Sequence, residues 1–370
     1  MRIGFDTSPM TARRSGIGNY VANLLQELLP LLDDGDQISG LSVGRSAPAY
    51  EQLAVAIQSR HIPIPARVMY QIWDRLGWPS ADGLLGGVDV YHATNFFLPP
   101  VKHARKVVSI PDASFAVVPD LCSPKIVGPF SASVAKFAQE ADVVLTISEA
   151  SKRDIVDHFG ADEDKVRVTY PGPGVITNSI DHDAAKKLLL DSYGIDKPFA
   201  LFVSTLEPRK NVPGLVRAFD QIARDLPHTL VLAGPLGWNT DPIVDAARSA
   251  DHADRILRVG FVDDDHLAAL YSTADVFVFP SFYEGFGLPV LEAMQYGCPV
   301  ITANNSALPE VGGDAAAYVE AGDDKALAAM MTRVLSDESV RSAMSELGQA
   351  QAARFTWRAC AEATLAAYRG

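Results

Sequence analysis

Long apolar runs are missing from this sequence. A helix that crosses a membrane needs roughly 18 consecutive apolar residues, and no run in the chain approaches that length. The opening stretch, MRIGFDTSPM, has too few apolar residues for a signal peptide and predicts a first β-strand. We therefore expect neither a transmembrane segment nor a leader peptide.

Cysteine is scarce as well. The chain has three, Cys122, Cys298 and Cys360, and their separations match neither a disulfide framework nor a metal-binding motif. A few isolated cysteines are typical of proteins from a reducing compartment. We expect a cytoplasmic protein.

Positive charge is in deficit. The sequence has 32 Lys and Arg against 45 Asp and Glu, a formal net charge of −13. Affinity for a nucleic-acid backbone needs clustered Lys and Arg, so a nucleic-acid partner is not expected. The hydrophobic fraction of 48% and the charged fraction of 21% are ordinary for a globular protein.

The chain does have a regular alternation of strand-like and helix-like segments. Short β-rich runs such as RIGFDT, VDVYHAT and DVVLTIS are followed by segments with helical periodicity. This alternation predicts the α/β class, with parallel sheets covered by helices on both faces.

The length of 370 residues suggests two domains. The alternation breaks at VTYPGPGVITNSIDHD, whose Pro, Gly and polar residues predict a connection between domains. We expect a first domain over 1–172, a linker region over 173–197 and a second domain over 198–354, with a helix over 355–370 packing back on the first. Ligands of doubly wound sheets bind outside the carboxyl ends of the strands.

The stretch SFYEGFGLPVLEAMQYG is the first candidate site, because it follows the buried strand-like run DVFVFP. Gly285 and Gly287 allow the backbone to approach a ligand closely, and Pro289 suits the first turn of a helix. The start of that helix is an anion site. Glu284 on the loop and Glu292 in the helix can each accept hydrogen bonds from vicinal hydroxyls.

The second candidate is STLEPRKN, at the end of the first strand of the C-terminal half. Arg209 and Lys210 follow a proline, so we expect them on a turn. An Arg fork beside a Lys charge suits a diphosphate and stabilises it as it leaves. The two motifs together predict a ligand in which a phosphate group lies between polyols, as in a sugar nucleotide.

These motifs, with LAGP and GFV between them and CPVI after them, resemble those of the retaining family 4 glycosyltransferases of the GT-B fold. In the N-terminal half GIGNY, YHATNFFLPP and IPDASF fall where that family has acceptor-side loops. The resemblance covers essentially the whole chain and is strongest to bacterial enzymes of surface polysaccharide synthesis, often mannosyltransferases. It implies two doubly wound, Rossmann-like domains facing across a cleft, the first binding acceptor and the second donor.

The resemblance also implies roles for the motif residues. Arg209 and Lys210 bind the diphosphate, Glu284 contacts hydroxyls of the donor sugar, and Glu292 binds the ribose. Leu288 opens the helix under the phosphate.

Further donor contacts follow from the same resemblance. Gly285, Phe286 and Gly287 offer backbone N–H groups to the sugar, and Phe261 and Val262 line the base pocket.

Three more glycines complete the implied donor site. Gly16 and Gly18 form a mobile loop facing the diphosphate, and Gly234 in LAGP belongs to the donor pocket.

The chain departs from the family at two positions. Many relatives have His-Asp where this sequence has Pro111-Asp112, and that histidine normally reaches the donor sugar. Asp112 stays a candidate catalytic residue beside Glu284, Arg209 and Lys210. Ser204 stands where relatives often have glycine, which narrows the space but allows a polar contact with the donor.

The implied reaction is the retaining transfer of a hexosyl group, first of all mannose from GDP-mannose, to a glycan or polyprenyl-linked acceptor in exopolysaccharide or lipopolysaccharide synthesis. No metal ion or other cofactor is implied, because the departing diphosphate helps to deprotonate the acceptor. Three alternatives stay open: a UDP- or dTDP-sugar donor carrying glucose, galactose or rhamnose, a UDP-sugar epimerase, and an inactive glycan-binding subunit.

Two other groups of residues have more than one interpretation. His92 follows a strand and suits either a structural hydrogen bond or a site. The aspartates 263–265 are expected to cap a helix rather than to bind a metal ion.

The stretch 60–80 mixes arginines with Trp73 and Trp78, and KHARK follows at 102–106. Arg and Trp together suit the surface of a membrane, so this face could rest on the inner membrane. The alternative is that the tryptophans pack in the N-terminal core.

Overall fold

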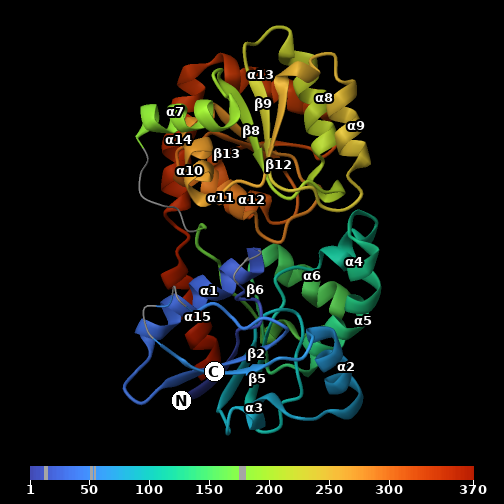
Figure 1. Ribbon diagram of the computed structural model, residues 1–370, viewed down its shortest axis with the longest axis vertical. Coiled ribbons are helices and arrows are strands. Elements are labelled where there is room, and N and C mark those ends of the chain that lie inside the picture. Colours follow the sequence, from blue (N-terminus) through green and yellow to red (C-terminus); the bar gives the residue numbers. More distant parts are fainter. Residues whose placement is uncertain (12–15, 51–52, 54–55, 175–180) are drawn as a thin grey trace. The chain divides into compact units, whose positions relative to one another are not determined.

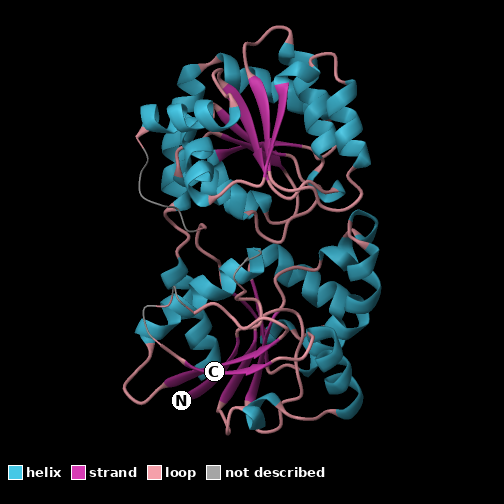
Figure 2. Ribbon diagram, viewed as in Figure 1, coloured by secondary structure: helices cyan, strands magenta, loops and turns pink. Residues whose placement is uncertain are grey.

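The computed structural model describes residues 1–370 except 12–15, 51–52, 54–55 and 175–180. The described part forms two compact units, each built around one parallel β-sheet flanked by helices (Figures 1 and 2). The predicted α/β class with two doubly wound halves is confirmed.

The last residues of the chain belong to the same unit as the first. Unit 1 contains Met1–Val117, Pro124–Gly172 and Thr356–Gly370, and unit 2 contains Val118–Ser123 and Pro173–Phe355.

Unit 1 has a sheet of seven parallel strands in the order β3-β2-β1-β4-β5-β6-β7. The chain leaves β1 toward one edge and returns to its other side at β4, so the switch point lies between β1 and β4. The strands are β1 (Arg2–Asp6), β2 (Gln37–Val43), β3 (Gln58–Ile62), β4 (Val90–Ala93), β5 (Arg105–Ser109), β6 (Val143–Thr146) and β7 (Val166–Val168). The helices are α1 (Gly16–Leu28), α2 (Ala66–Leu76), α3 (Ala81–Leu84), α4 (Ser114–Val117), α5 (Pro124–Glu140), α6 (Glu149–Phe159) and α15 (Trp357–Arg369).

Strands β2 and β3 have no counterpart among the apolar runs of the sequence. Their residues are QISGLSV and QSRHI, too polar to read as buried strands. A polar contact joins them, because Ser42 Oγ lies 2.9 Å from His61 Nδ1. Gly40 packs closely, since a Cβ there would lie 3.0 Å from the Tyr50 hydroxyl and would displace that side chain slightly. Pairing within the parallel sheet makes these segments strands, and in β2 it buries the scattered apolar side chains of Ile38, Leu41 and Val43.

The C-terminal helix α15 is part of the core of unit 1. Its Leu365 and Tyr368 are buried in one cluster with Phe5 of β1 and Leu24 of α1. Helix α15 therefore packs with α1 against the first sheet, although some 350 residues of chain separate it from β1.

His92 in β4 has a structural role. The residue is fully buried, its Nδ1 lies 2.7 Å from the Tyr368 hydroxyl, and its Nε2 lies 2.8 Å from Ser109 Oγ. Burial lowers the pKa of His92 to about 3, so the ring is neutral. Both ring nitrogens bind protein groups, which ties α15 to the sheet and leaves neither for a ligand.

The two tryptophans of the stretch 60–80 differ in environment. Trp73 is 5% exposed, its Nε1 donates to Pro79 O at 2.7 Å, and its ring stacks near Phe97. Trp78 is 65% exposed, and Leu76 beside it is 69% exposed. The core interpretation is correct for Trp73, which cannot reach a membrane, whereas Trp78 lies on the surface.

Unit 2 has a six-stranded parallel sheet in the order β10-β9-β8-β11-β12-β13, with the switch point between β8 and β11. The strands are β8 (Phe199–Val203), β9 (Thr229–Ala233), β10 (Ile256–Gly260), β11 (Val276–Phe279), β12 (Val300–Ala303) and β13 (Ala316–Val319). The helices are α7 (His182–Tyr193), α8 (Val212–Ala223), α9 (Asp241–Ser249), α10 (Asp264–Thr273), α11 (Leu288–Gln295), α12 (Leu308–Gly312), α13 (Asp324–Ser336) and α14 (Glu338–Ala352).

The expected linker region, 173–197, is partly helical. Helix α7 lies within it and packs against α10, so it belongs to unit 2. Asp181 caps this helix by accepting from the backbone N–H groups of Asp183 and Ala184. An N-cap aspartate and an apolar face turned to α10 explain why a polar stretch folds here. Residues 175–180 of the expected linker lie outside the described residues.

Candidate functional site

The two sequence motifs of unit 2 meet at the switch point of its sheet. EPRKN follows β8, and SFYEGFG follows β11, the neighbour of β8. Parallel strands present their carboxyl ends at one edge, so the loops after β8 and β11 lie at the same edge of the sheet, where ligands of doubly wound sheets bind. Phe282 N donates to Arg209 O at 2.9 Å, which holds the two loops together.

A cluster of charged side chains lies where these loops meet. Glu284 accepts from Lys210 Nζ at 2.6 Å and from Arg209 Nη1 at 3.0 Å. Arg209 also donates from Nη2 to Glu207 at 2.9 Å and from Nη1 to the carbonyl of Tyr283 at 2.6 Å. The structure thus brings two predicted catalytic residues, Arg209 and Lys210, together with a third, Glu284, which lies 74 positions beyond Lys210 in the sequence.

Burial makes this cluster costly unless its charges stay paired. Lys210 and Glu284 are each 7% exposed. Burial by itself raises the pKa of Glu284, but the charges of Arg209 and Lys210 outweigh it and hold that pKa at about 2. Burial lowers the pKa of Lys210, and the Glu284 carboxylate offsets part of this effect. Most adjacent Arg and Lys residues lie solvated on the surface. Arg209 and Lys210 instead form a largely buried, paired cluster.

The loop after β12 fixes the backbone of Glu284. Ser306 Oγ accepts from the Glu284 N–H at 2.9 Å, and the Glu284 carbonyl accepts from Ala307 N at 3.3 Å. Ser306 has a positive φ of 49° and also donates to Asn305 Oδ1. Because Ser306 and Ala307 hold the main chain of Glu284, its carboxylate keeps its direction without a ligand.

Helix α11 starts directly after the second glycine of the motif. Gly287 is its N-cap, with φ of 114°, where a Cβ would be strained and would also lie 3.1 Å from Leu308 Cδ2. Pro289 lies in the first turn, as predicted. The N-terminus of α11, which is the positive end of its helix dipole, therefore lies at the end of the loop that carries Glu284.

Glu292 lies one turn into α11. Its Oε2 accepts from the Tyr271 hydroxyl at 3.1 Å, and it also accepts from the backbone N–H of Gly174. Burial raises the pKa of Glu292 to about 7, since these two hydrogen bonds offset the loss of water only in part. This carboxyl group changes its charge near neutral pH.

The remaining predicted donor residues of unit 2 lie at the same edge of the sheet. Gly285 and Phe286 are buried between Glu284 and α11. Ser204 directly follows β8, and Gly234 directly follows β9. Gly234 has a φ of 133° and lies so close to the Ser204 carbonyl that a Cβ at 234 would overlap it. Only glycine fits at 234, and this keeps the strand ends close together.

Two residues lie further along the edge. Phe261 and Val262 follow β10, the outermost strand, and Phe261 is 79% exposed. An exposed ring of this size on a loop at the carboxyl edge offers a flat apolar surface. Asp263, next in sequence, caps α10 through the N–H of His266 at 3.0 Å, as expected.

Unit 1 holds the other predicted residues. Gly16 and Gly18 lie in the first turn of α1 and not in a loop, while 12–15 before them lie outside the described residues. Asp112 follows β5, and its Oδ1 accepts from Ser114 N at 2.8 Å at the start of α4. The carbonyl of Pro111 accepts from Thr146 Oγ1 at 3.3 Å.

Three participants were not singled out from the sequence. Glu207 lies inside the quoted EPRKN motif, so the motif itself was a signal. Tyr271 and Gly174 are distant from Glu292 in sequence, and nothing local marks them. Among the described residues, no group of three or more His, Cys, Asp or Glu could hold a metal ion.

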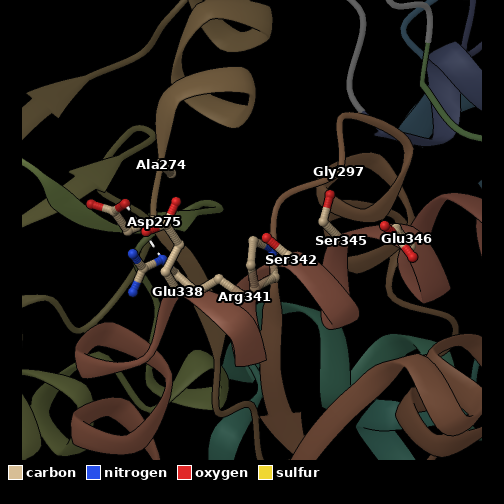
Figure 3. Close-up of a pocket in the computed structure, with 9 residues that line it drawn as sticks. Ala274, Asp275, Gly297, Glu338, Arg341, Ser342, Ser345 and Glu346 are labelled. Carbon is tan, nitrogen blue, oxygen red and sulfur yellow. Dashed lines mark ion pairs between the residues drawn. The ribbon is translucent and has the colours of Figure 1, made fainter.

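A separate open pocket of about 400 Å³ lies at the amino ends of β11 and β12 (Figure 3). Asp275 and Arg341 face each other there, with Oδ1 and Nε 3.8 Å apart, and Ser345 and Glu346 line the far side. It contains none of the predicted site residues, because those lie at the carboxyl ends of the strands.

Comparison with known proteins identifies the family. The family described as "Glycosyl transferases group 1" matches residues 188–351. The O-antigen chain mannosyltransferase B of Escherichia coli is 30% identical over 393 aligned residues, which cover 100% of both chains. The chain belongs to the group 1 glycosyltransferases. It is a transferase, and the resemblance seen in its motifs is confirmed.

Solved structures agree on the fold. Sucrose-phosphate synthase from Thermosynechococcus elongatus superposes with a TM-score of 0.76 at 20% identity, covering 100% of this chain and 98% of the other. HepE from Anabaena, solved with UDP-glucose, gives a TM-score of 0.72 at 18% identity, covering 99% of each chain. The glycosyltransferase thus has the predicted GT-B type of fold. No helix in the described part of the chain is long and apolar enough to cross a membrane.

Proposed function

We propose that this glycosyltransferase moves a mannosyl group from GDP-mannose, with retention of configuration, onto a glycan or lipid-linked saccharide in surface polysaccharide synthesis. The observation that carries the proposal is the buried Arg209–Lys210–Glu284 cluster beside the start of α11. The full-length similarity to a mannosyltransferase of an O-antigen chain supports the sugar and the acceptor class.

The cluster suits the stabilisation of a leaving diphosphate. The cations of Arg209 and Lys210 are held in place before the donor binds, so they need little reorganisation when charge develops on the phosphate. In the donor-free protein the Glu284 carboxylate neutralises part of this charge. Once phosphate oxygens share the cations, Glu284 can accept from hydroxyls of the donor sugar.

In the proposed reaction the bond between the anomeric carbon and the diphosphate oxygen breaks, and the acceptor oxygen bonds to the same face of that carbon. The acceptor proton passes to the departing diphosphate, so no metal ion or protein base is needed. Glu292 would hold the ribose, Phe261 and Val262 the base, and Asp112 of unit 1 a hydroxyl of a substrate.

A panel of nucleotides tests the donor. We expect GDP and GDP-mannose to raise the melting temperature, because a ligand at one hundred times its dissociation constant adds about 2.7 kcal/mol of stability. A rise in the melting temperature with UDP or dTDP compounds alone would contradict GDP-mannose and favour the alternative donors. Turnover without an acceptor would support an epimerase, and binding without transfer to any glycan acceptor an inactive subunit.

We further propose a peripheral contact with an anionic membrane at one surface of unit 1, formed by Leu76 and Trp78 with Arg75 and Lys102. Both apolar side chains are more than 60% exposed. The main chain of Lys102 is tied to the segment that follows Trp78, because the Lys102 N–H donates to Asp82 of α3 at 3.1 Å. An exposed aromatic ring among cations suits the head-group layer of such a membrane.

Vesicle co-sedimentation checks this contact. The protein should bind vesicles of anionic phosphatidylglycerol more than those of phosphatidylcholine, and a Leu76→Ser/Trp78→Ser variant should lose most of that binding. Leu347→Ser, which removes a 52% exposed leucine from α14, is the matched control and should bind normally. Equal binding by all three proteins contradicts the proposal.

A further inference from the structure

The main chain of Gly174 lies against the carboxylate of Glu292. The Gly174 N–H donates to that carboxylate, and a Cβ on Gly174 would overlap Glu292 Oε1. The φ of Gly174 lies outside the left-handed region, so its backbone conformation does not itself demand glycine. The need for glycine comes from the contact with Glu292, because any side chain at position 174 must displace the Glu292 carboxylate or the segment that contains residue 174.

The second oxygen of Glu292 has a different partner. The Tyr271 hydroxyl, from α10, donates to Oε2 at 3.1 Å, and Tyr271 is 1% exposed. Tyr296 stacks on Tyr271 with its ring 6.0 Å away, which limits the movement of the tyrosine. A carboxylate has about four acceptor positions. Two protein donors fix its orientation and leave capacity for two more hydroxyl groups.

We propose that Gly174 and Tyr271 are positioning residues that aim the Glu292 carboxylate at the two ribose hydroxyls of the donor. The inference rests on the proposed function, in which Glu292 binds ribose. Gly174 is the second residue of unit 2, directly after Pro173, where the chain enters from unit 1. Recognition of the ribose is thereby linked to the conformation of the chain at its entry into the donor unit.

The neighbouring glycine of the PGPG segment supplies a matched control. A Cβ on Gly172 would lie 2.6 Å from both N and Cδ1 of Trp357, at the start of α15 in unit 1. Alanine at 172 therefore creates a similar steric conflict two residues away, but against a partner that does not touch Glu292.

The test compares binding of GDP with binding of 2′-deoxy-GDP by calorimetry. Wild-type protein should prefer the ribonucleotide by about tenfold, the effect expected of one hydrogen bond to a charged group. Gly174→Ala and Tyr271→Phe should each lose most of this preference by weakening GDP binding, while affinity for 2′-deoxy-GDP stays the same. Gly172→Ala should keep the preference. Gly174→Ala in a Glu292→Gln background should have no further effect.

The outcomes separate this inference from the proposed function. If Glu292→Gln keeps the full preference for ribose, Glu292 does not bind it and the assumption about the site fails. If Glu292→Gln loses the preference but Gly174→Ala and Tyr271→Phe retain it, only the positioning role is wrong. A Gly174→Ala variant that weakens both nucleotides equally would show general damage and overturn the role of Gly174. If that variant does not fold, the result for Tyr271→Phe decides.

Discussion

Lys210→Met is expected to lower the rate of transfer by at least about a hundredfold, the loss typical when one stabilising group for a developing charge is removed. The Lys210 side chain lies against Phe279, with its Nζ 5.1 Å from the ring centre. Methionine keeps much of the apolar length of this side chain and removes its charge. The measurement is kcat/KM with a saturating acceptor. Turnover like that of the wild type would contradict the proposed role in binding the diphosphate.

The same substitution should also destabilise unit 2. It removes the cation that lies 2.6 Å from the buried Glu284 carboxylate and leaves the 3.0 Å pair with Arg209. Breaking a buried ion pair costs about 3–5 kcal/mol, whereas replacing both partners by neutral groups is often close to neutral. We therefore expect the double variant Lys210→Met/Glu284→Gln to recover stability in urea unfolding but not activity.

Lys187→Met is the matched control for this pair of effects. Lys187 Nζ lies 2.6 Å from Asp191, the same distance as in the buried pair, but its side chain is 75% exposed. Exposed pairs contribute about 0–1 kcal/mol. Loss of stability in Lys187→Met equal to that in Lys210→Met would mean that burial does not decide the cost.

Affinity for the nucleotide sugar should fall by about tenfold for each pH unit below 7, a difference of about 1.4 kcal/mol per unit. The reason is the pKa of Glu292, which burial raises to about 7, so that acid protonates the carboxylate expected to accept from ribose. The donor itself is the right probe, because the terminal phosphate of a free nucleoside diphosphate titrates near pH 6. In Glu292→Gln the slope should disappear.

The stability of the donor-free protein gives an independent check with its own sign. The pKa of Glu292 is raised above its usual value of 4.5. From about pH 4.5 to 7 the unfolded chain releases this proton while the folded protein keeps it, so this group lowers stability as pH rises and has no further effect above 7. Glu292→Gln should remove that decline. A variant with the same pH dependence as the wild type would assign it to other groups.

The sequence alone predicts the features of this protein that depend on neighbouring residues. Strand-like runs alternating with helical segments predict the two parallel sheets, because both periodicities repeat within a few residues. Pro289 and the glycines before it predict the loop and the start of α11 for the same local reason. The sequence does not predict strands where apolar runs are absent, as in β2 and β3 of unit 1.

The tertiary structure alone decides which of these residues meet and which are buried. Nothing local distinguishes Trp73 in the core from Trp78 at the surface, and nothing near His92 predicts its contact with Tyr368, since the partners are 276 positions apart. The Lys210–Glu284 pair joins loops 74 positions apart, and Gly174, where the chain enters unit 2, contacts Glu292 in α11. Such contacts depend on strand order and packing, because a chain segment specifies its own conformation but not the neighbour that the fold brings to it.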